Sequence, residues 1–155
     1  MKNLLTEISQ IGVAVSDLEA AIAAMRCIFG VEPDEFLGPS NAPRLYHGRK
    51  VACETKIALY RFANIEIELI EPVCGESVWS DFVRDKGTGV QHLKFSVDSF
   101  AAAAAQLGAA GYLPEMEGDS ARTVPGLKWA YFDTGRDLGY SVEIFNDKEV
   151  CAARL

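Results

Sequence analysis

Four polar side chains suited to metal binding occupy matching places in two similar parts of the sequence. The segment QIGVAV, which begins at Gln10, repeats as HLKFSV, which begins at His92, and Glu68 in EIELI matches Glu143 in SVEIF. An amide oxygen, an imidazole nitrogen and two carboxylates form an acceptable ligand set for Zn²⁺, Co²⁺, Ni²⁺ or Mn²⁺. If both halves face a common groove, the repeat predicts one divalent-metal site built from two half-sites.

The strand that positions Glu68 can be read from its alternating pattern. Residues 64–72 alternate apolar and acidic side chains, which is typical of a half-buried strand. Ile67 and Leu69 are expected to pack against helices, with Glu66 and Glu68 on the opposite face. A solvated outer face is the ordinary interpretation of such a strand. Only Glu68 has a partner in the repeat, so we expect Glu68 in the site and Glu66 at its rim.

The same reasoning predicts the other elements. Further strands are expected at 8–15, 55–62, 90–98, 128–133 and 139–145, and helices at 18–29, 76–86 and 99–107. Ser16-Asp17 and Ser77 are candidate N-caps, and Gly30 is expected to end the first helix. Prolines and glycines interrupt every pattern in residues 33–50, so this segment is predicted to be a loop or lid with little regular structure. Each half therefore reads as strand, helix, strand, strand, strand.

Length and composition exclude several classes of protein. The 155 residues suit a single domain, 1–155, with halves at 6–75 and 88–147 joined by the helix at 76–86. A net charge of −7 argues against nucleic acid as a partner, because phosphate binding needs a basic face. No signal peptide or membrane span is evident, and the four cysteines are scattered, so we expect a cytoplasmic protein with reduced thiols.

Several segments, taken together and in order, carry a family resemblance. They are IGVAVSDL (11–18), IELIEP (67–72), GTGVQHL (87–93), and AYFDT (130–134) followed by VEI (142–144). With them the chain resembles the vicinal oxygen chelate superfamily, which includes glyoxalase I, methylmalonyl-CoA epimerase, extradiol dioxygenases and metal-free resistance proteins. The resemblance implies an α+β fold in which two βαβββ modules form a U-shaped, eight-stranded mixed sheet, usually in a homodimer.

The resemblance also implies a chemistry. Gln10, Glu68, His92 and Glu143 stand where the family places its metal ligands, and a similar set binds zinc in some glyoxalase I enzymes. Such enzymes move a proton next to a metal-polarised carbonyl, which makes Glu143 and Glu68 the candidate base and acid. Glu54 is a further candidate base. The implied function is an isomerase, epimerase or lyase acting on a small carbonyl compound, with an acyl-CoA thioester ahead of a hemithioacetal.

Other residues receive weaker assignments. Lys94 and Ser96 share the face of His92 and could touch the substrate, although a solvated lysine at the edge of the groove explains Lys94 equally well. Tyr60 and Trp129 are among the aromatic residues that could wall a pocket, although core packing is the more common role of aromatic strand residues. In the segment 33–50, three cations flank His47 and could meet an anionic substrate such as a CoA phosphate; a charged loop also needs no such role. These cations are Arg44, Arg49 and Lys50.

Two alternatives remain at the level of sequence. An extradiol dioxygenase needs two histidines and a carboxylate on iron, and Gln10 replaces one of the histidines. A non-catalytic protein of the same fold could sequester a small molecule in the groove, with the four polar side chains held by hydrogen bonds alone.

Overall fold

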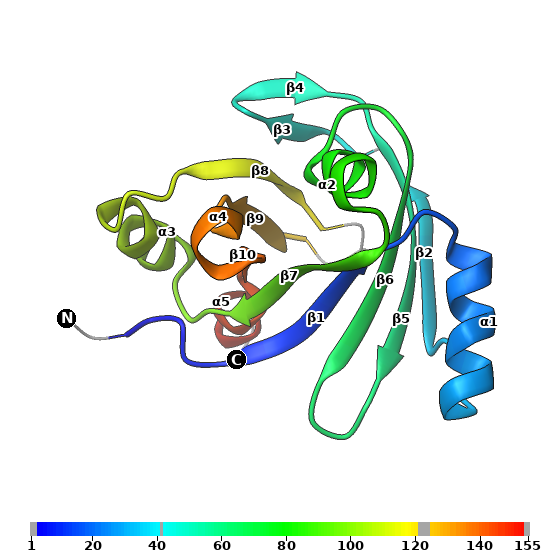
Figure 1. Cartoon of the computed structure of the whole chain (residues 1–155). Coiled ribbons are helices and arrows are strands. Elements are labelled where there is room, and N and C mark those ends of the chain that lie inside the picture. The colour runs from blue at the N-terminus through cyan, green and yellow to red at the C-terminus, as the bar shows by residue number, and fades with distance from the viewer. Residues whose placement is uncertain (1–2, 41, 121–124, 154–155) are drawn as a thin grey trace.

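In the part of the chain that the structure describes, ten strands form one curled mixed sheet that bends into an open half-barrel, with helices around it (Figure 1). The computed structural model describes residues 3–40, 42–120 and 125–153. The strands are β1 (Ile8–Ala14), β2 (Glu35–Ser40), β3 (Arg44–Tyr46), β4 (Arg49–Val51), β5 (Glu54–Arg61), β6 (Glu66–Cys74), β7 (Gly89–Ser96), β8 (Pro114–Asp119), β9 (Lys128–Phe132) and β10 (Ser141–Phe145). The helices are α1 (Leu18–Phe29), α2 (Val78–Lys86), α3 (Phe100–Ala109), α4 (Gly135–Leu138) and α5 (Asp147–Ala152).

Apart from β3 and β4 at one edge, the order of the strands is symmetric about the pair β1–β7. The strands lie in the order β2-β5-β6-β1-β7-β10-β9-β8-β3-β4. β1 and β7 are antiparallel, with Gln10 opposite Lys94 and Gly12 opposite His92, and each has a parallel neighbour, β6 or β10. This register is the one expected if a two-fold axis exchanges the two halves, because the pair Gln10–Lys94 then becomes the equivalent pair His92–Gly12. The predicted α+β fold with two βαβββ halves is therefore confirmed.

The predicted number of eight strands is wrong, because the segment 33–50 is more regular than its prolines suggest. It contains β2, whose register shifts between Leu37 and Ser40, so that Pro39 lies in an irregular part of an edge strand. It also contains the β3–β4 hairpin. His47 and Gly48, with φ of 48° and 73°, form a two-residue turn with the backbone twist that tight hairpins favour. The hairpin pairs with β8 of the second half.

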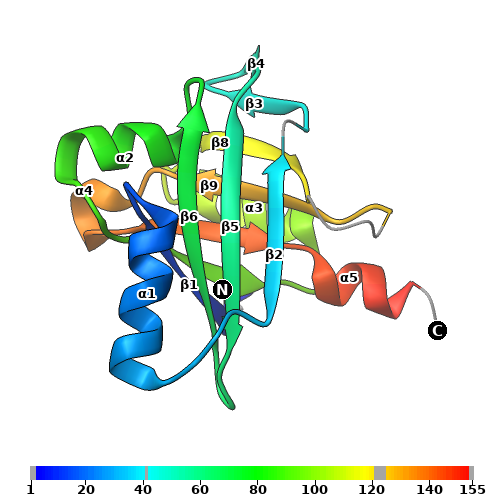
Figure 2. The ribbon, with the colours of Figure 1, turned by 90° about the vertical axis from the view of Figure 1, so that its right-hand side faces the viewer.

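Three apolar cores hold the sheet in its curled shape. Between the two wings, β5 and β6 face β9 and β10, and α2 packs into the gap. On the outer side of the first wing α1 packs against β5 and β6, and on the outer side of the second wing α3 packs against β9 and β10 (Figure 2). Alternation along β6 follows the prediction, since Ile67 and Leu69 face α1 while Glu68 and Ile70 face inward.

The helix ends follow local sequence signals. Asp17 caps α1 by accepting a hydrogen bond from the Ala20 N–H at 2.9 Å, and Gly30 ends it with a φ of 67°. Ser77 and Ser80 form a reciprocal capping box at the start of α2. Among the described residues, none of the helices has the length and apolar character needed to cross a membrane.

Candidate functional site

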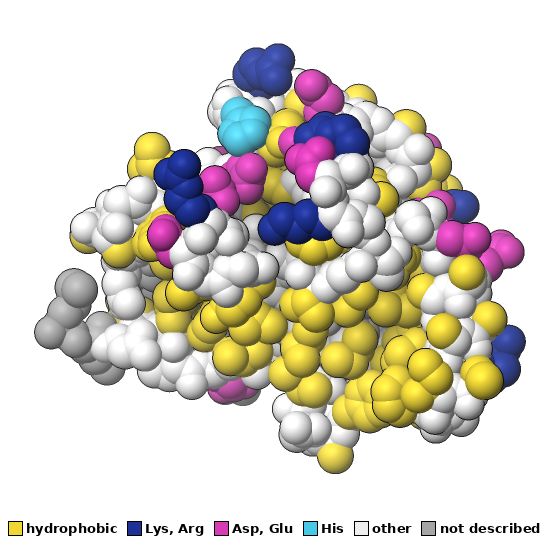
Figure 3. Space-filling model, in the orientation of Figure 1, with side chains coloured by type: hydrophobic (Ala, Val, Ile, Leu, Met, Phe, Trp, Pro, Cys, Tyr) yellow, Lys and Arg dark blue, Asp and Glu magenta, His cyan; other side chains and the backbone are white. Residues whose placement is uncertain are grey.

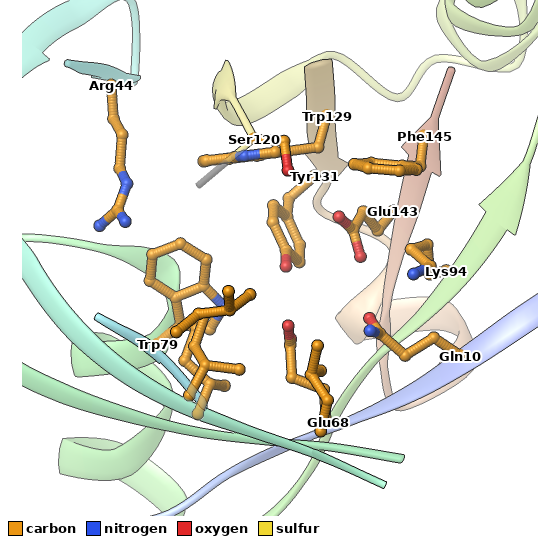
Figure 4. Close-up of a pocket in the computed structure, with 14 residues that line it drawn as sticks. Gln10, Arg44, Glu68, Trp79, Lys94, Ser120, Trp129, Tyr131, Glu143 and Phe145 are labelled. Carbon is orange, nitrogen blue, oxygen red and sulfur yellow. The ribbon is translucent and has the colours of Figure 1, made fainter. Parts of the chain in front are cut away.

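Four side chains from the four central strands converge at one point, and we call Gln10, Glu68, His92 and Glu143 the quartet. From His92 Nε2 the distances are 3.3 Å to Glu68 Oε2, 3.3 Å to Glu143 Oε2 and 3.4 Å to Gln10 Oε1. All four side chains are buried, and His92 is fully buried. Figure 4 shows Gln10, Glu68 and Glu143 pointing toward a common centre. The sheet therefore brings together the residues that the repeat selected.

Gly12 makes room for the His92 ring. It lies between the two strands that carry Glu68 and His92 and is their register partner. A Cβ atom at Gly12 would lie 1.8 Å from His92 Cε1 and 2.1 Å from Nε2, which no real contact allows. The imidazole thus lies flat against the backbone of β1, and any side chain at position 12 would displace it.

A β-bulge in β7 orients His92. Gly12 pairs with His92 and Val13 with Val90, so Gln91 is an extra residue that brings its side chain beside the ring. Gln91 Oε1 lies 2.7 Å from His92 Nδ1, and Gln91 Nε2 donates to Ser141 Oγ at 3.2 Å. Because the Gln91 oxygen can only accept, this contact places a proton on Nδ1. In the neutral ring the Nε2 lone pair then faces the three oxygens.

The buried position of Glu143 disfavours the charged form of its carboxyl group. Burial raises the pKa of its carboxyl to about 7, although the nearby His92 and Lys94 lower it. Glu143 Oε2 lies within ion-pair distance of His92 Nε2, but this oxygen has no hydrogen-bond partner among the described residues. Burial, followed by the neighbouring carboxylates, also raises the pKa of Tyr131 above its usual value. Tyr131 thus remains a neutral hydroxyl, 3.5 Å from His92 Nε2.

Three members of the quartet, Gln10, Glu68 and Glu143, line a pocket of about 550 Å³, a volume that includes its open mouth, and His92 lies behind them. Trp79 of α2, with Trp129 and Phe145 of the second wing, supplies aromatic surface. The carboxylates that line the pocket, within the described ranges, are Glu68 and Glu143. The pocket therefore combines an apolar interior with a polar end, which is typical of small-molecule sites.

Glu66 and Lys94 hold the rim of the quartet. Gln10 Nε2 donates to Glu66 Oε1 at 2.6 Å, which turns the Gln10 amide oxygen toward His92. Lys94 lines the pocket, with Nζ 3.4 Å from Glu66 Oε1 and 5.0 Å from the centre of the Phe145 ring. Lys94 is thus already paired with a carboxylate. Glu66 lies at the rim of the site and orients Gln10.

The other residues singled out by sequence separate into two groups. Trp129 lines the pocket, whereas Ser96, Tyr60 and Glu54 do not. The Ser96 hydroxyl instead bonds to Ser9 and Asp147 at 2.9 Å each. Tyr60 packs on the outer side of the sheet in the α1 core. Neither of these positions allows direct contact with a molecule in the pocket.

Sequence reasoning missed Gln91 and Gly12 and did not predict the burial of Arg44. Gln91 received no role, because simple alternation places it opposite His92 and a bulge leaves no reliable mark in a single sequence. Gly12 had a signal, since it is the glycine within an otherwise apolar repeat and its register partner is a proposed ligand. Arg44 was named with Arg49 and Lys50 as a cation that could meet an anionic substrate, and the structure shows that it is 5% exposed and lines the pocket.

The donor set of the quartet fits a divalent metal. Ligands about 2.0–2.1 Å from a zinc ion lie about 3.0–3.4 Å from one another, which is the spacing around His92 Nε2. The unpartnered Glu143 oxygen and the Nε2 lone pair are the atoms that such an ion would satisfy. As they stand, the described residues contain no group of three or more His, Cys, Asp or Glu side chains placed so that they could hold a metal ion.

A family model matches most of the chain. The model of the Glyoxalase/Bleomycin resistance protein/Dioxygenase superfamily aligns with residues 9–131. The chain belongs to this superfamily. Its match includes the strands that carry Gln10, Glu68 and His92, and ends before Glu143. No curated protein matches the sequence.

Solved structures of this superfamily fold extend the comparison to the whole chain. Methylmalonyl-CoA epimerase from Mycobacterium tuberculosis has a TM-score of 0.66 and 18% identity, covering 99% of this chain and 95% of that one. A hypothetical protein from Bacillus halodurans has a TM-score of 0.66 and 21% identity, covering 92% and 95%. A variant Streptomyces coelicolor methylmalonyl-CoA epimerase with bound 2-nitronate-propionyl-CoA has a TM-score of 0.64 and 20% identity, covering 92% of this chain and 94% of that one. At these identities the likeness shows the fold alone.

Proposed function

We propose that this protein is a metal-dependent isomerase, epimerase or lyase that moves a proton on the carbon next to a carbonyl. The observation that supports it best is the quartet, which gathers an amide oxygen, an imidazole nitrogen and two carboxylates at the end of an apolar pocket. Superfamily membership agrees with this chemistry, and similar folds include methylmalonyl-CoA epimerases.

In this proposal the quartet would hold Zn²⁺, Co²⁺, Ni²⁺ or Mn²⁺ through Gln10 Oε1, His92 Nε2 and one oxygen each of Glu68 and Glu143. The bound ion would polarise the substrate carbonyl and stabilise the negative charge that develops on its oxygen. Gln91 fixes the required tautomer of His92, and Glu66 fixes the orientation of the Gln10 amide.

The proton transfer is assigned to the two glutamates. Glu143 is assigned as the base that takes the α-proton, because its carboxyl lines the pocket beside His92. Glu68, on the other side of His92, is the second acid or base, because β5 contributes Ile57 and Leu59 to the pocket but none of its carboxylates. The neutral Tyr131 hydroxyl can donate a hydrogen bond beside them.

We further propose a small carbonyl substrate, with an acyl-CoA thioester ahead of a hemithioacetal, and a homodimer in solution. Support for the dimer is the exposure of Phe29 and Phe36, which are 59% and 62% exposed on the outer side of the first wing. Sedimentation of the wild type and a Phe36→Glu variant tests the dimer. A wild-type monomer would contradict it.

Solvent deuterium exchange tests the proposed activity. Methylmalonyl-CoA is incubated in D₂O with protein equilibrated with Co²⁺ or Zn²⁺, and label at the α-carbon is followed by mass spectrometry. We expect label with the wild type, a loss of about a hundredfold or more in rate for Glu143→Gln, and little change for the surface variant Glu76→Gln. Binding of thioesters and hemithioacetals without label or turnover would favour the sequestering protein instead.

A further inference from the structure

Arg44 is a buried cation that has no carboxylate partner among the described residues. It lies on β3 and is 5% exposed, and no Asp or Glu of the described residues forms an ion pair with it. Its guanidinium donates to neutral acceptors: the Cys53 carbonyl at 3.2 Å, the Cys53 sulfur at 2.9 Å and the Thr55 hydroxyl at 3.1 Å. Burying an unpaired charge costs several kcal/mol. An anion from outside the chain would offset that cost.

The guanidinium keeps donors available for such an anion. An arginine has five N–H donors, and the contacts to Cys53 and Thr55 use three of them. The Nε–H is buried with no acceptor in the described residues. The Arg44 guanidinium also lies over Trp79, with its Cζ 5.2 Å from the ring centre, which is a cation–π contact.

The other cations near the pocket, Lys94 and Arg49, are paired with carboxylates. Lys94, which also lines the pocket, is paired with Glu66. Arg49 lies on the same hairpin as Arg44, but its side chain is 70% exposed and lies 3.7 Å from Glu76. Figure 3 shows that charged side chains gather around the hairpin and α2 at the surface, whereas Arg44 lies inside. Arg44 is thus the pocket cation whose charge remains uncompensated by described carboxylates.

The fold builds a specific place for Arg44. Gly118 of β8 pairs with Arg44 on one side and Trp129 on the other. A Cβ at Gly118 would lie 2.9 Å from the Trp129 ring and 3.2 Å from Arg44 Cγ, so a glycine is needed for both side chains to pass. The β3–β4 hairpin, which adds two strands to the symmetric sheet of eight, therefore delivers a cation into the pocket.

We propose that Arg44 binds a carboxylate of the substrate, at the side of the pocket away from the quartet. Figure 4 shows Arg44 and Gln10 on opposite sides, with Trp79 below Arg44. The inference rests on the proposed function and names its substrate class: a carbonyl compound that carries a second, anionic group remote from the reacting carbon. A planar carboxylate matches the arginine fork in two parallel hydrogen bonds, and a buried guanidinium discriminates strongly against a neutral group.

Binding of a small oxo acid and its neutral amide tests the inference. Titration calorimetry compares 4-oxopentanoate with 4-oxopentanamide on the purified full chain and on Arg44→Met. We expect the wild type to bind the acid about tenfold or more tightly than the amide, and the variant to lose that preference. Arg49→Met is the matched control, since it removes the same charge from the same hairpin, and it should keep the preference.

The outcomes separate this inference from the proposed function. Glu143→Gln, which lacks the proposed base, should still prefer the acid if Arg44 reads the carboxylate. Equal binding of acid and amide by the wild type, a preference that survives in Arg44→Met, or no binding of either compound at millimolar concentration would overturn the inference. Stronger competition by inorganic phosphate than by 4-oxopentanoate would overturn the assignment to a carboxylate. If Arg44→Met does not fold, Arg44→Lys replaces it, and an unchanged preference there contradicts a role for the fork.

Discussion

At the scale of single residues, burial gives the glutamates their distinct roles. Glu68 and Glu143 occupy matching places in the two halves and approach the same imidazole nitrogen. Glu71, three residues after Glu68, accepts a hydrogen bond from the Leu18 N–H at 2.8 Å and so supports the start of α1. The sequence pattern offers all three as acidic residues, and only their positions in the sheet distinguish a proposed ligand from a structural carboxylate.

Replacing Glu68 should weaken metal binding, whereas replacing Glu71 should not. We expect Glu68→Gln to lower the affinity for Zn²⁺ by about a hundredfold or more, since even outer-shell partners are worth about ten- to a hundredfold. Glu71→Gln should lower stability by about 1 kcal/mol while leaving the affinity unchanged. Competition with a fluorescent chelator measures both. Equal losses of affinity would mean that the repeat misassigned Glu68.

The raised pKa of Glu143 predicts a pH dependence of stability in chelator-treated protein. The folded-state pKa, about 7, lies above the ordinary carboxyl value of 4.5, so the folded protein binds a proton more tightly than the unfolded chain. The stabilisation is complete below the ordinary value and is lost as the pH rises through about 7. Urea unfolding at pH 5 and pH 8 should therefore give a lower free energy of unfolding at pH 8. Glu143→Gln should reduce that difference, and an unchanged difference would contradict the assigned cause.

At the scale of elements, close contact between strands decides whether the quartet can form. His92 reaches the other three members because β1 presents a glycine where the ring crosses it. The bulge at Gln91 then fixes the ring by its Nδ1 atom. The position of the ligand thus depends on two backbone features as much as on its own residue type.

Substituting Gly12 should disrupt the site. Gly12→Ala forces a methyl group into the His92 ring, and we expect a loss of about 1–3 kcal/mol in stability together with loss of metal binding. Gly108→Ala in α3 is the control, because its added Cβ meets nothing within 4 Å. That change should raise stability by about 0.5–1 kcal/mol. Urea unfolding measures both, and a Gly12→Ala protein with native stability and metal affinity would refute the close packing.

The elements also show where sequence reasoning succeeds and fails. Caps such as Asp17 and Ser77 are local signals, and the structure places α1 and α2 where those signals put them. The β3–β4 hairpin was not predicted, because it is stabilised by pairing with β8, a contact between distant segments. The burial of Arg44 depends on that pairing. The burial of Arg44 therefore could not be predicted from the segment 33–50 alone.

At the scale of the whole molecule, the two halves meet at the site. Gln10 and Glu68 come from the first half, and His92 and Glu143 from the second. An ion bound by all four would join both wings of the sheet and would stabilise the folded chain as any ligand specific to that state does. The repeat predicted this convergence on the condition that both halves face a common groove, and the antiparallel pairing of β1 with β7 meets that condition.

Metal should therefore raise the temperature of unfolding of the entire domain. We expect excess Zn²⁺ or Co²⁺ to shift the midpoint upward in a single transition, by an amount that grows with metal concentration. His92→Ala removes the central ligand and should abolish the shift. Differential scanning calorimetry with Mg²⁺ as a control measures it. A shift of equal size in His92→Ala would assign the effect to ions bound elsewhere.

The most direct test of the central claim is the metal content of the wild-type protein. The full chain is equilibrated separately with Zn²⁺, Co²⁺, Ni²⁺ and Mn²⁺, freed of unbound ions, and analysed by native mass spectrometry and elemental analysis. The quartet predicts one divalent ion per chain for at least one of these metals, and a marked loss in Glu68→Gln and Glu143→Gln. A wild type that retains none of the four metals would contradict the proposed metal-dependent enzyme.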